Sequence, residues 1–83
     1  MRVIVIKEEN MFVGQCLEHD ICAQGSTVPE LMERLSLTAS LEADDRGGSL
    51  EGLEPAPDHF HQMWDSALRF AEQQNGYEMA LAA

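Results

Sequence analysis

The chain has 83 residues and 45% of them are hydrophobic, so its length and composition fit one small globular domain. Fifteen aspartates and glutamates against five lysines and arginines give a net charge of −10, which argues against binding to nucleic-acid phosphates and favours a basic partner. The longest apolar run near the start, residues 3–6, is too short for a signal peptide or a membrane span, so we expect a cytoplasmic protein.

The first 25 residues predict three antiparallel β-strands. Residues 1–7 (MRVIVIK) contain four consecutive β-branched residues, which favour a central and well-buried strand. Residues 11–17 (MFVGQCL) predict a second strand, in which Gly14 indicates a bulge or a close approach of another backbone. Residues 21–24 (ICAQ) predict a short third strand that ends at Gly25. Because only a short polar turn separates each strand from the next, we expect a meander.

A helix is predicted to follow directly. Thr27 and Glu30 have the spacing of a capping box, and Pro29 lies in the first turn, where proline is favoured. We expect the helix to run to about residue 44, before Gly47 and Gly48, with its charged residues directed away from the core. The hydrophobic residues that recur at helical spacing and define its apolar face are Val28, Leu31, Met32, Leu35 and Ala39.

The second half of the chain predicts one further amphipathic helix and a tail. Residues 49–53 fit either a fourth short strand or an ordered loop. Pro57 opens the helix, Asp58 supports its first turn, and Gly76 is the expected stop. Its apolar residues repeat at helical spacing: Phe60, Met63, Trp64, Ala67, Leu68 and Ala71.

The expected architecture is therefore α+β, with a single domain over residues 1–76 and a C-terminal tail over residues 77–83. An antiparallel sheet of three to four strands carries one packed helix, and the second amphipathic helix is C-terminal.

The segment Cys16-x-x-His19-x-x-Cys22 raises the question of a metal or redox site. A three-residue turn would place the two cysteines side by side on one face, whereas a two-residue turn would place them on opposite faces. His19 lies at the turn in either case, and a structural zinc site needs four ligands. His59 and His61 are about 200° apart on a helix and do not add a pair. We therefore expect free thiols and neither a metal nor another cofactor.

The sequence also lacks the usual catalytic motifs. It has no G-x-S-x-G around its serines, no P-loop and no G-x-G-x-x-G. Neighbouring carboxylates such as Asp44 and Asp45 are expected at a solvated helix end rather than in an acid–base pair. We expect a protein without enzymatic activity.

The order of three strands followed by Gly-x-Thr-x-x-Glu at the start of a helix resembles the HicB-like antitoxin family. The resemblance is carried by residues 12–35 (FVGQCLEHDICAQGSTVPELMERL), and residues 54–64 (EPAPDHFHQMW) look like the extension in small single-domain members. It implies an α/β fold similar in topology to the double-stranded-RNA-binding domain. It also implies that the chain binds a small basic HicA-type ribonuclease toxin and covers its active site. Many members add a DNA-binding module, which we do not expect in the seven residues after Gly76.

The leading interpretation is thus an antitoxin-like protein-binding module, and the alternative is a stand-alone homo-oligomeric protein of the same fold with another protein partner or none. Helical periodicity and the predicted turn, rather than any family motif, suggest the carboxylates that would contact a basic partner. These are Glu18, Asp20, Glu30, Glu33 and Glu42. Phe60, Trp64 and Phe70 extend around the second predicted helix more widely than a small sheet can cover. We therefore expect a homodimer or a higher even-numbered oligomer, with this helix or a strand edge at the interface.

Overall fold

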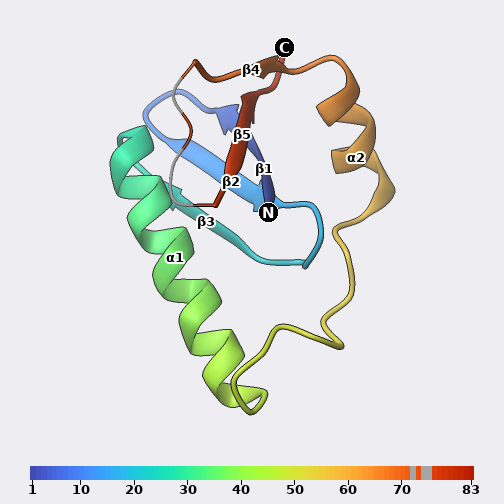
Figure 1. The fold of residues 1–83 in the computed structure, drawn as a ribbon. Coiled ribbons are helices and arrows are strands. Elements are labelled where there is room, and N and C mark those ends of the chain that lie inside the picture. Colours follow the sequence, from blue (N-terminus) through green and yellow to red (C-terminus); the bar gives the residue numbers. More distant parts are fainter. Residues whose placement is uncertain (72, 74–75) are drawn as a thin grey trace.

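The computed structural model describes residues 1–71, 73 and 76–83, and within them a five-stranded sheet lies between a long helix and a short one (Figure 1). The chain is α+β, as predicted. In chain order the elements are β1 (Arg2–Lys7), β2 (Phe12–Cys16), β3 (Cys22–Gly25), α1 (Val28–Asp45), α2 (Asp58–Asp65), β4 (Leu68–Arg69) and β5 (Glu78–Leu81). Neither described helix is long and apolar enough to cross a membrane.

The sheet is mixed rather than purely antiparallel, and its strand order is β3-β2-β1-β5-β4. The predicted meander of β1, β2 and β3 is confirmed, since β2 pairs antiparallel with both of its neighbours. The other half of the sheet was not predicted. Residues 77–83, expected as a tail, contain β5, which pairs in parallel with β1 from Arg2 opposite Glu78 to Val5 opposite Leu81. The pairing joins the two ends of the chain, and no local pattern indicates so distant a partner.

The second helix is shorter than predicted. The prediction extended the helix too far because the hydrophobic residues keep their helical spacing beyond the point where the helix ends. α2 stops at Asp65, and Leu68 and Arg69 pair with Leu81 and Ala80 of β5 as the edge strand β4. The pairing with β5 therefore outweighs the local helical pattern. Tertiary contacts commonly outweigh the intrinsic helix propensity of a segment in this way. Residues 49–53 form a turn-containing loop and not a fourth strand.

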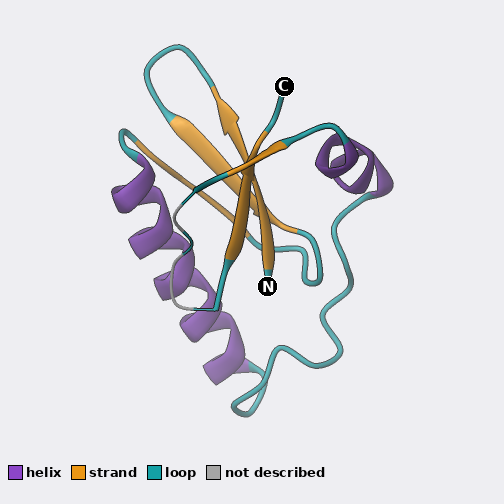
Figure 2. Cartoon of the chain, turned by 45° about the horizontal axis from the view of Figure 1, so that its top comes forward, coloured by secondary structure: helices purple, strands orange, loops and turns teal. Residues whose placement is uncertain are grey.

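The two helices lie on opposite sides of the sheet (Figure 2), and each face of the sheet carries its own hydrophobic core. On one face, Val3 and Val5 pack with the apolar side of α1, which includes Leu31 and Leu35. On the other face, Ile4, Leu17 and Ala80 pack with Trp64 of α2. Alternate residues of β1 thus enter different cores, and this explains why its hydrophobic run does not alternate with polar residues.

Two glycines let α1 lie close to the sheet. A Cβ atom on Gly25 would lie 2.6 Å from the backbone nitrogen of Leu31, and one on Gly14 would lie 3.0 Å from its Cδ1. Thr27 caps the helix by accepting a hydrogen bond from the Glu30 backbone N–H at 3.2 Å, as predicted. The Glu30 carboxylate completes the cap one residue earlier than in a standard capping box, because it accepts from the Ser26 N–H at 3.1 Å.

A chain that ends at Gly76 should fail to fold cooperatively. It would lose the whole of β5, including Met79 and Ala80, which are 1% and 0% exposed. Loss of a buried methionine side chain alone costs about 2–5 kcal/mol, and loss of the β1–β5 ladder adds to this. Circular dichroism during thermal unfolding tests this prediction. Removal of the exposed Ala83 alone is the control and should leave the melting temperature unchanged. A cooperative transition in the shorter chain would contradict the central role of β5.

Candidate functional site

The two cysteines lie on opposite faces of the sheet, which settles the alternatives left open by the sequence. β2 and β3 pair with Gln15 opposite Cys22, so Cys16 points into the α1 core while Cys22 is exposed on the other side. His19 turns away from both, and its Nδ1 lies 3.3 Å from the backbone oxygen of Leu53. The three side chains therefore do not converge. Among the residues that the structure describes, no group of three or more His, Cys, Asp or Glu side chains could hold a metal ion.

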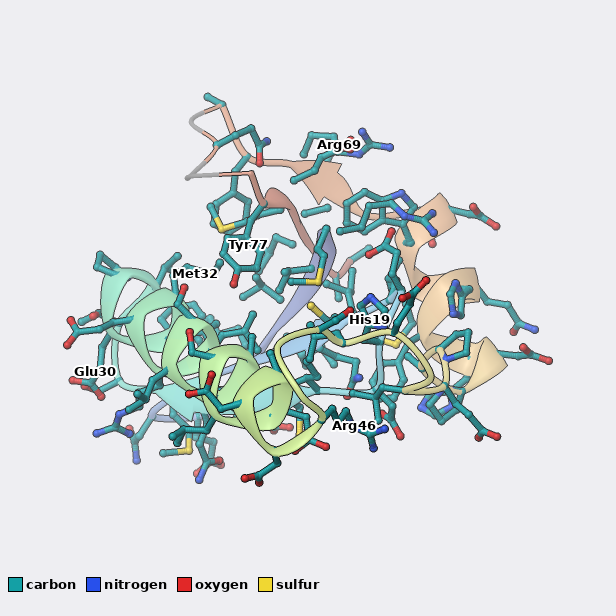
Figure 3. All side chains as sticks on the ribbon, turned by 60° about the horizontal axis from the view of Figure 1, so that its bottom comes forward. His19, Glu30, Met32, Arg46, Arg69 and Tyr77 are labelled. Atoms are coloured by element: carbon teal, nitrogen blue, oxygen red, sulfur yellow. The ribbon has the colours of Figure 1, made fainter. Side chains whose placement is uncertain are left out.

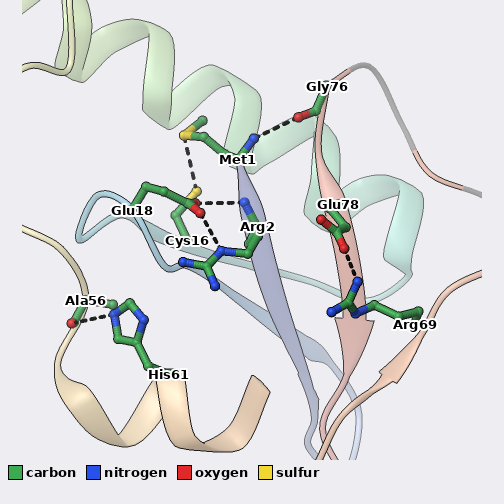
Figure 4. Close-up of polar contacts among 9 residues, drawn as sticks. All are labelled: Met1, Arg2, Cys16, Glu18, Ala56, His61, Arg69, Gly76 and Glu78. Carbon is green, nitrogen blue, oxygen red and sulfur yellow. Dashed lines mark hydrogen bonds and ion pairs between the residues drawn. The ribbon is translucent and has the colours of Figure 1, made fainter. Parts of the chain in front are cut away.

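The Cys16 thiol is held in its neutral form. Burial and, as a smaller contribution, the negative charge of Glu18 raise the pKa of Cys16, the N-terminal ammonium partly offsets them, and the net result is a pKa of about 11. Its Sγ lies 3.7 Å from the sulfur of Met1 (Figure 4). Since the thiolate is the reactive species, Cys16 is a packing residue at neutral pH. No pocket is present in the described part of the chain.

Glu18 forms the most extensive polar contact of the β2–β3 loop (Figure 4). Its Oε1 accepts from the backbone N–H of Arg2 at 2.7 Å, and its Oε2 accepts from the Arg2 Nε at 2.6 Å. Partial burial favours a higher pKa for Glu18, but these hydrogen bonds and the charge of Arg2 outweigh it and lower the pKa below its usual value. Glu18 therefore fixes the loop to β1 and does not present an unpaired charge to a partner.

The three aromatic residues predicted at an oligomer interface do not form a continuous surface on the chain. Trp64 is only 6% exposed and lies in the monomer core, with the guanidinium carbons of Arg2 and Arg69 at 5.8 and 4.6 Å from its ring centroid. Phe60 packs against the same core, but Phe70 packs against the core on the other face of the sheet. The three aromatic residues do not share a face, because the helix that would have aligned them ends at residue 65.

The five carboxylates predicted to meet a basic partner are not gathered on one surface. Glu30 lies at the first turn of α1, and Glu42 lies near the opposite end, where Arg46 also lies (Figure 3). Twelve residues of helix separate these two glutamates by about 18 Å. Both are engaged within the chain, Glu30 by Ser26 and Arg34 and Glu42 by the Arg46 Nε at 3.1 Å.

Of the remaining two carboxylates of this set, one also has a polar partner within the chain and the other has no ion pair among the described residues. Asp20, in the β2–β3 loop, accepts a hydrogen bond from the side chain of Gln15 in β2 at 3.0 Å, which holds the loop to that strand. Glu33 is exposed and has no ion pair among the described residues. Of the five, Glu33 is thus the carboxylate best placed to meet a partner.

The outer face of α1 carries the apolar surface that the sequence analysis missed. Leu37 and Leu41 are 59% and 57% exposed, and they lie four residues apart, on the same side of the helix. The third large exposed hydrophobic residue of the described chain, Leu68 at 73%, lies on β4. The sequence could have indicated this surface, because the two leucines lie outside the predicted apolar face, where an amphipathic helix is expected to carry polar residues.

Carboxylates flank these leucines. Glu33 lies one turn before Leu37, and Asp44 and Asp45 follow Leu41 in the last turn of α1. The last turn contains no basic residue, although the negative end of the helix dipole favours cations there. Glu42 is offset by Arg46, whereas Asp44 and Asp45 have no ion pair in the described chain. We define the α1 outer surface as Glu33, Leu37, Leu41, Asp44 and Asp45.

Comparison with known proteins gives no match to this chain among protein-family models, curated proteins or solved structures.

Replacing Glu18 with Gln should lower the free energy of unfolding by about 1 kcal/mol near pH 7, because the partly exposed ion pair with Arg2 is lost. The pKa of Glu18 is lower in the folded chain than in the unfolded chain. Its contribution is therefore complete above the unfolded value of about 4.3, and it is lost as the pH falls through the folded value.

Urea unfolding of both proteins from pH 7 to pH 2 measures this, and the difference between them should shrink at the acid end. Glu33→Gln is the control, because Glu33 is exposed without an ion pair in the described chain, and its effect should be near zero throughout. A Glu18→Gln difference that stays constant with pH would contradict the assignment.

Replacing Asp44 and Asp45 together with Asn should stabilise the isolated protein. Removal of two negative charges from the negative end of the α1 dipole should raise the free energy of unfolding by about 0.5–1 kcal/mol at low salt. Urea unfolding measures the change. The matched control is Glu8→Gln with Glu9→Gln, which removes the same charge from the exposed β1–β2 turn. If the control stabilises the protein equally, the effect reflects net charge and not the helix end.

Proposed function

We propose that the chain is a non-enzymatic, antitoxin-like module that binds a small basic ribonuclease of the HicA type and covers its active site. The observation that carries the proposal is that most of the basic side chains are already paired with carboxylates of the same chain. Four of the five basic residues are held in ion pairs within the chain: Arg2 with Glu18, Arg34 with Glu30, Arg46 with Glu42 and Arg69 with Glu78.

These pairs leave a surface that is dominated by carboxylates. They neutralise four negative charges, but the chain as a whole retains a net charge of −10. A basic ribonuclease presents the opposite charge in the groove where it binds RNA, so the two surfaces would attract each other at long range. The capping box and the glycine before α1, on which the family resemblance rests, are present in the fold and give it further support.

The alternative is a stand-alone homo-oligomeric protein of this fold, with another protein partner or none. The aromatic surface that led us to expect self-association is divided between two cores. A net charge of −10 on each subunit also opposes association of identical chains. The antitoxin-like function is therefore the better supported of the two.

Co-expression tests the proposal. If a small basic protein is encoded beside the gene for this chain, the chain should restore growth to cells that produce the basic protein and should co-purify with it. The association rate constant should fall at least tenfold between about 50 and 500 mM salt, because screening shortens the range of the attraction to a few ångströms. Absence of both rescue and co-purification, with the basic protein shown to be an active ribonuclease, would contradict the antitoxin-like function and favour the homo-oligomer.

A further inference from the structure

We propose that a basic protein partner docks on the α1 outer surface, an inference that rests on the proposed function. Leu37 and Leu41 form the centre of this surface, and its rim is formed by Glu33, Asp44 and Asp45. This assignment differs from the five carboxylates predicted from sequence, of which it retains Glu33 alone. The partner is identified by its chemistry, as a positively charged protein surface with an apolar centre.

The first argument is the arrangement of apolar and charged groups. Protein interfaces place apolar side chains at the centre and polar groups at the rim. Leu37 and Leu41 are both more than half exposed, and each successive turn of the same helix side continues with a carboxylate, Glu33 before them and Asp44 after them. Leu68 is also exposed, but it lies alone on a two-residue edge strand. The α1 outer surface is thus the described site where exposed leucines and unpaired carboxylates meet.

The second argument is electrostatic and independent of the leucines. Asp44 and Asp45 occupy the negative end of the α1 helix dipole, where the dipole disfavours negative charge. Arg46, the C-cap residue at this end, is paired with Glu42, and Arg34 is paired with Glu30, so neither cation forms an ion pair with Asp44 or Asp45. Cations contributed by a partner would satisfy Asp44 and Asp45. Local features that reduce stability without a compensating contact within the chain are typical of functional surfaces.

The same features argue against a second copy of this chain as the occupant. Two copies that met through this surface would bring Glu33, Asp44 and Asp45 of each chain together, and like charges in contact are repulsive. A basic partner gains from both the leucines and the carboxylates.

The test uses the full chain and a defined probe, a synthetic helical peptide with leucine along one face and lysine at the other positions. Fluorescence anisotropy of the labelled peptide measures its dissociation constant. Leu37→Ser combined with Leu41→Ser should weaken binding at least tenfold, while the matched Leu68→Ser should change it less than twofold. Asp44→Asn with Asp45→Asn should weaken binding several-fold and raise the melting temperature. Glu8→Gln with Glu9→Gln removes the same charge, and it should weaken peptide binding less and raise the melting temperature less.

Amide chemical shifts of the wild-type chain locate the contact without any substitution, so the test does not depend on the folding of a variant. Shifts concentrated at residues 33–45 support the proposal. No binding of the peptide, shifts centred elsewhere, or equal effects of the leucine variants and their control would overturn it. Sedimentation showing a wild-type dimer that Leu37→Ser with Leu41→Ser dissociates would assign the surface to a second copy and overturn it as well.

Where a small basic protein is encoded beside the gene for this chain, binding of that protein by the same variants separates this inference from the proposed function. Failure of the wild-type chain to bind that protein, with the peptide still located on α1, counts against the ribonuclease partner alone. Binding of that protein with unchanged affinity in the leucine variants counts against the α1 outer surface alone.

Discussion

The burial of β1 on both faces and along both edges is the constraint on which the rest of the fold depends. Val3 and Val5 enter the α1 core, Ile4 enters the α2 core, and all three are fully buried. Such a strand needs a neighbour on each edge, because buried backbone N–H and C=O groups must be paired. β2 follows directly in sequence and fills one edge, whereas β5 comes from the far end of the chain and fills the other. Neither half of the chain can complete the sheet alone, so both cores form together.

The same arrangement leaves the sheet little capacity to extend by strand addition. At one edge, Arg34 of α1 donates a hydrogen bond at 3.2 Å to the backbone oxygen of Gln24 in β3. At the other edge, β4 is only two residues long and its Arg69 is paired with Glu78. Short edge strands and charged side chains at an edge are common protections against intermolecular pairing. Backbone pairing at the sheet edges is therefore disfavoured, which agrees with the proposal that a partner contacts side chains of a helix.

The features predictable from sequence are those with a local cause. The capping box at Thr27, the meander of the first three strands and the apolar face of α1 each follow from neighbouring residues, and all are present. The parallel pairing of β5 could not be predicted, because its stabilising contacts lie with β1 and its own four residues resemble a tail. The end of α2 at Asp65 was missed for a related reason, since β4 forms only where β5 is already in place.

In the candidate site, helical periodicity predicts which residues face away from the core, but it does not predict which of them are paired with other residues of the chain. Periodicity correctly placed Glu30 and Glu42 away from the core, but it could not show that Ser26 and Arg46 engage them. Charges satisfied within the chain must be desolvated and separated before they can bind elsewhere, which reduces what they contribute to affinity. The carboxylates that remain unpaired in the described part of α1 need no such exchange. Where acidic residues are abundant, the pattern of internal pairing rather than their number therefore indicates which surface a basic partner can use.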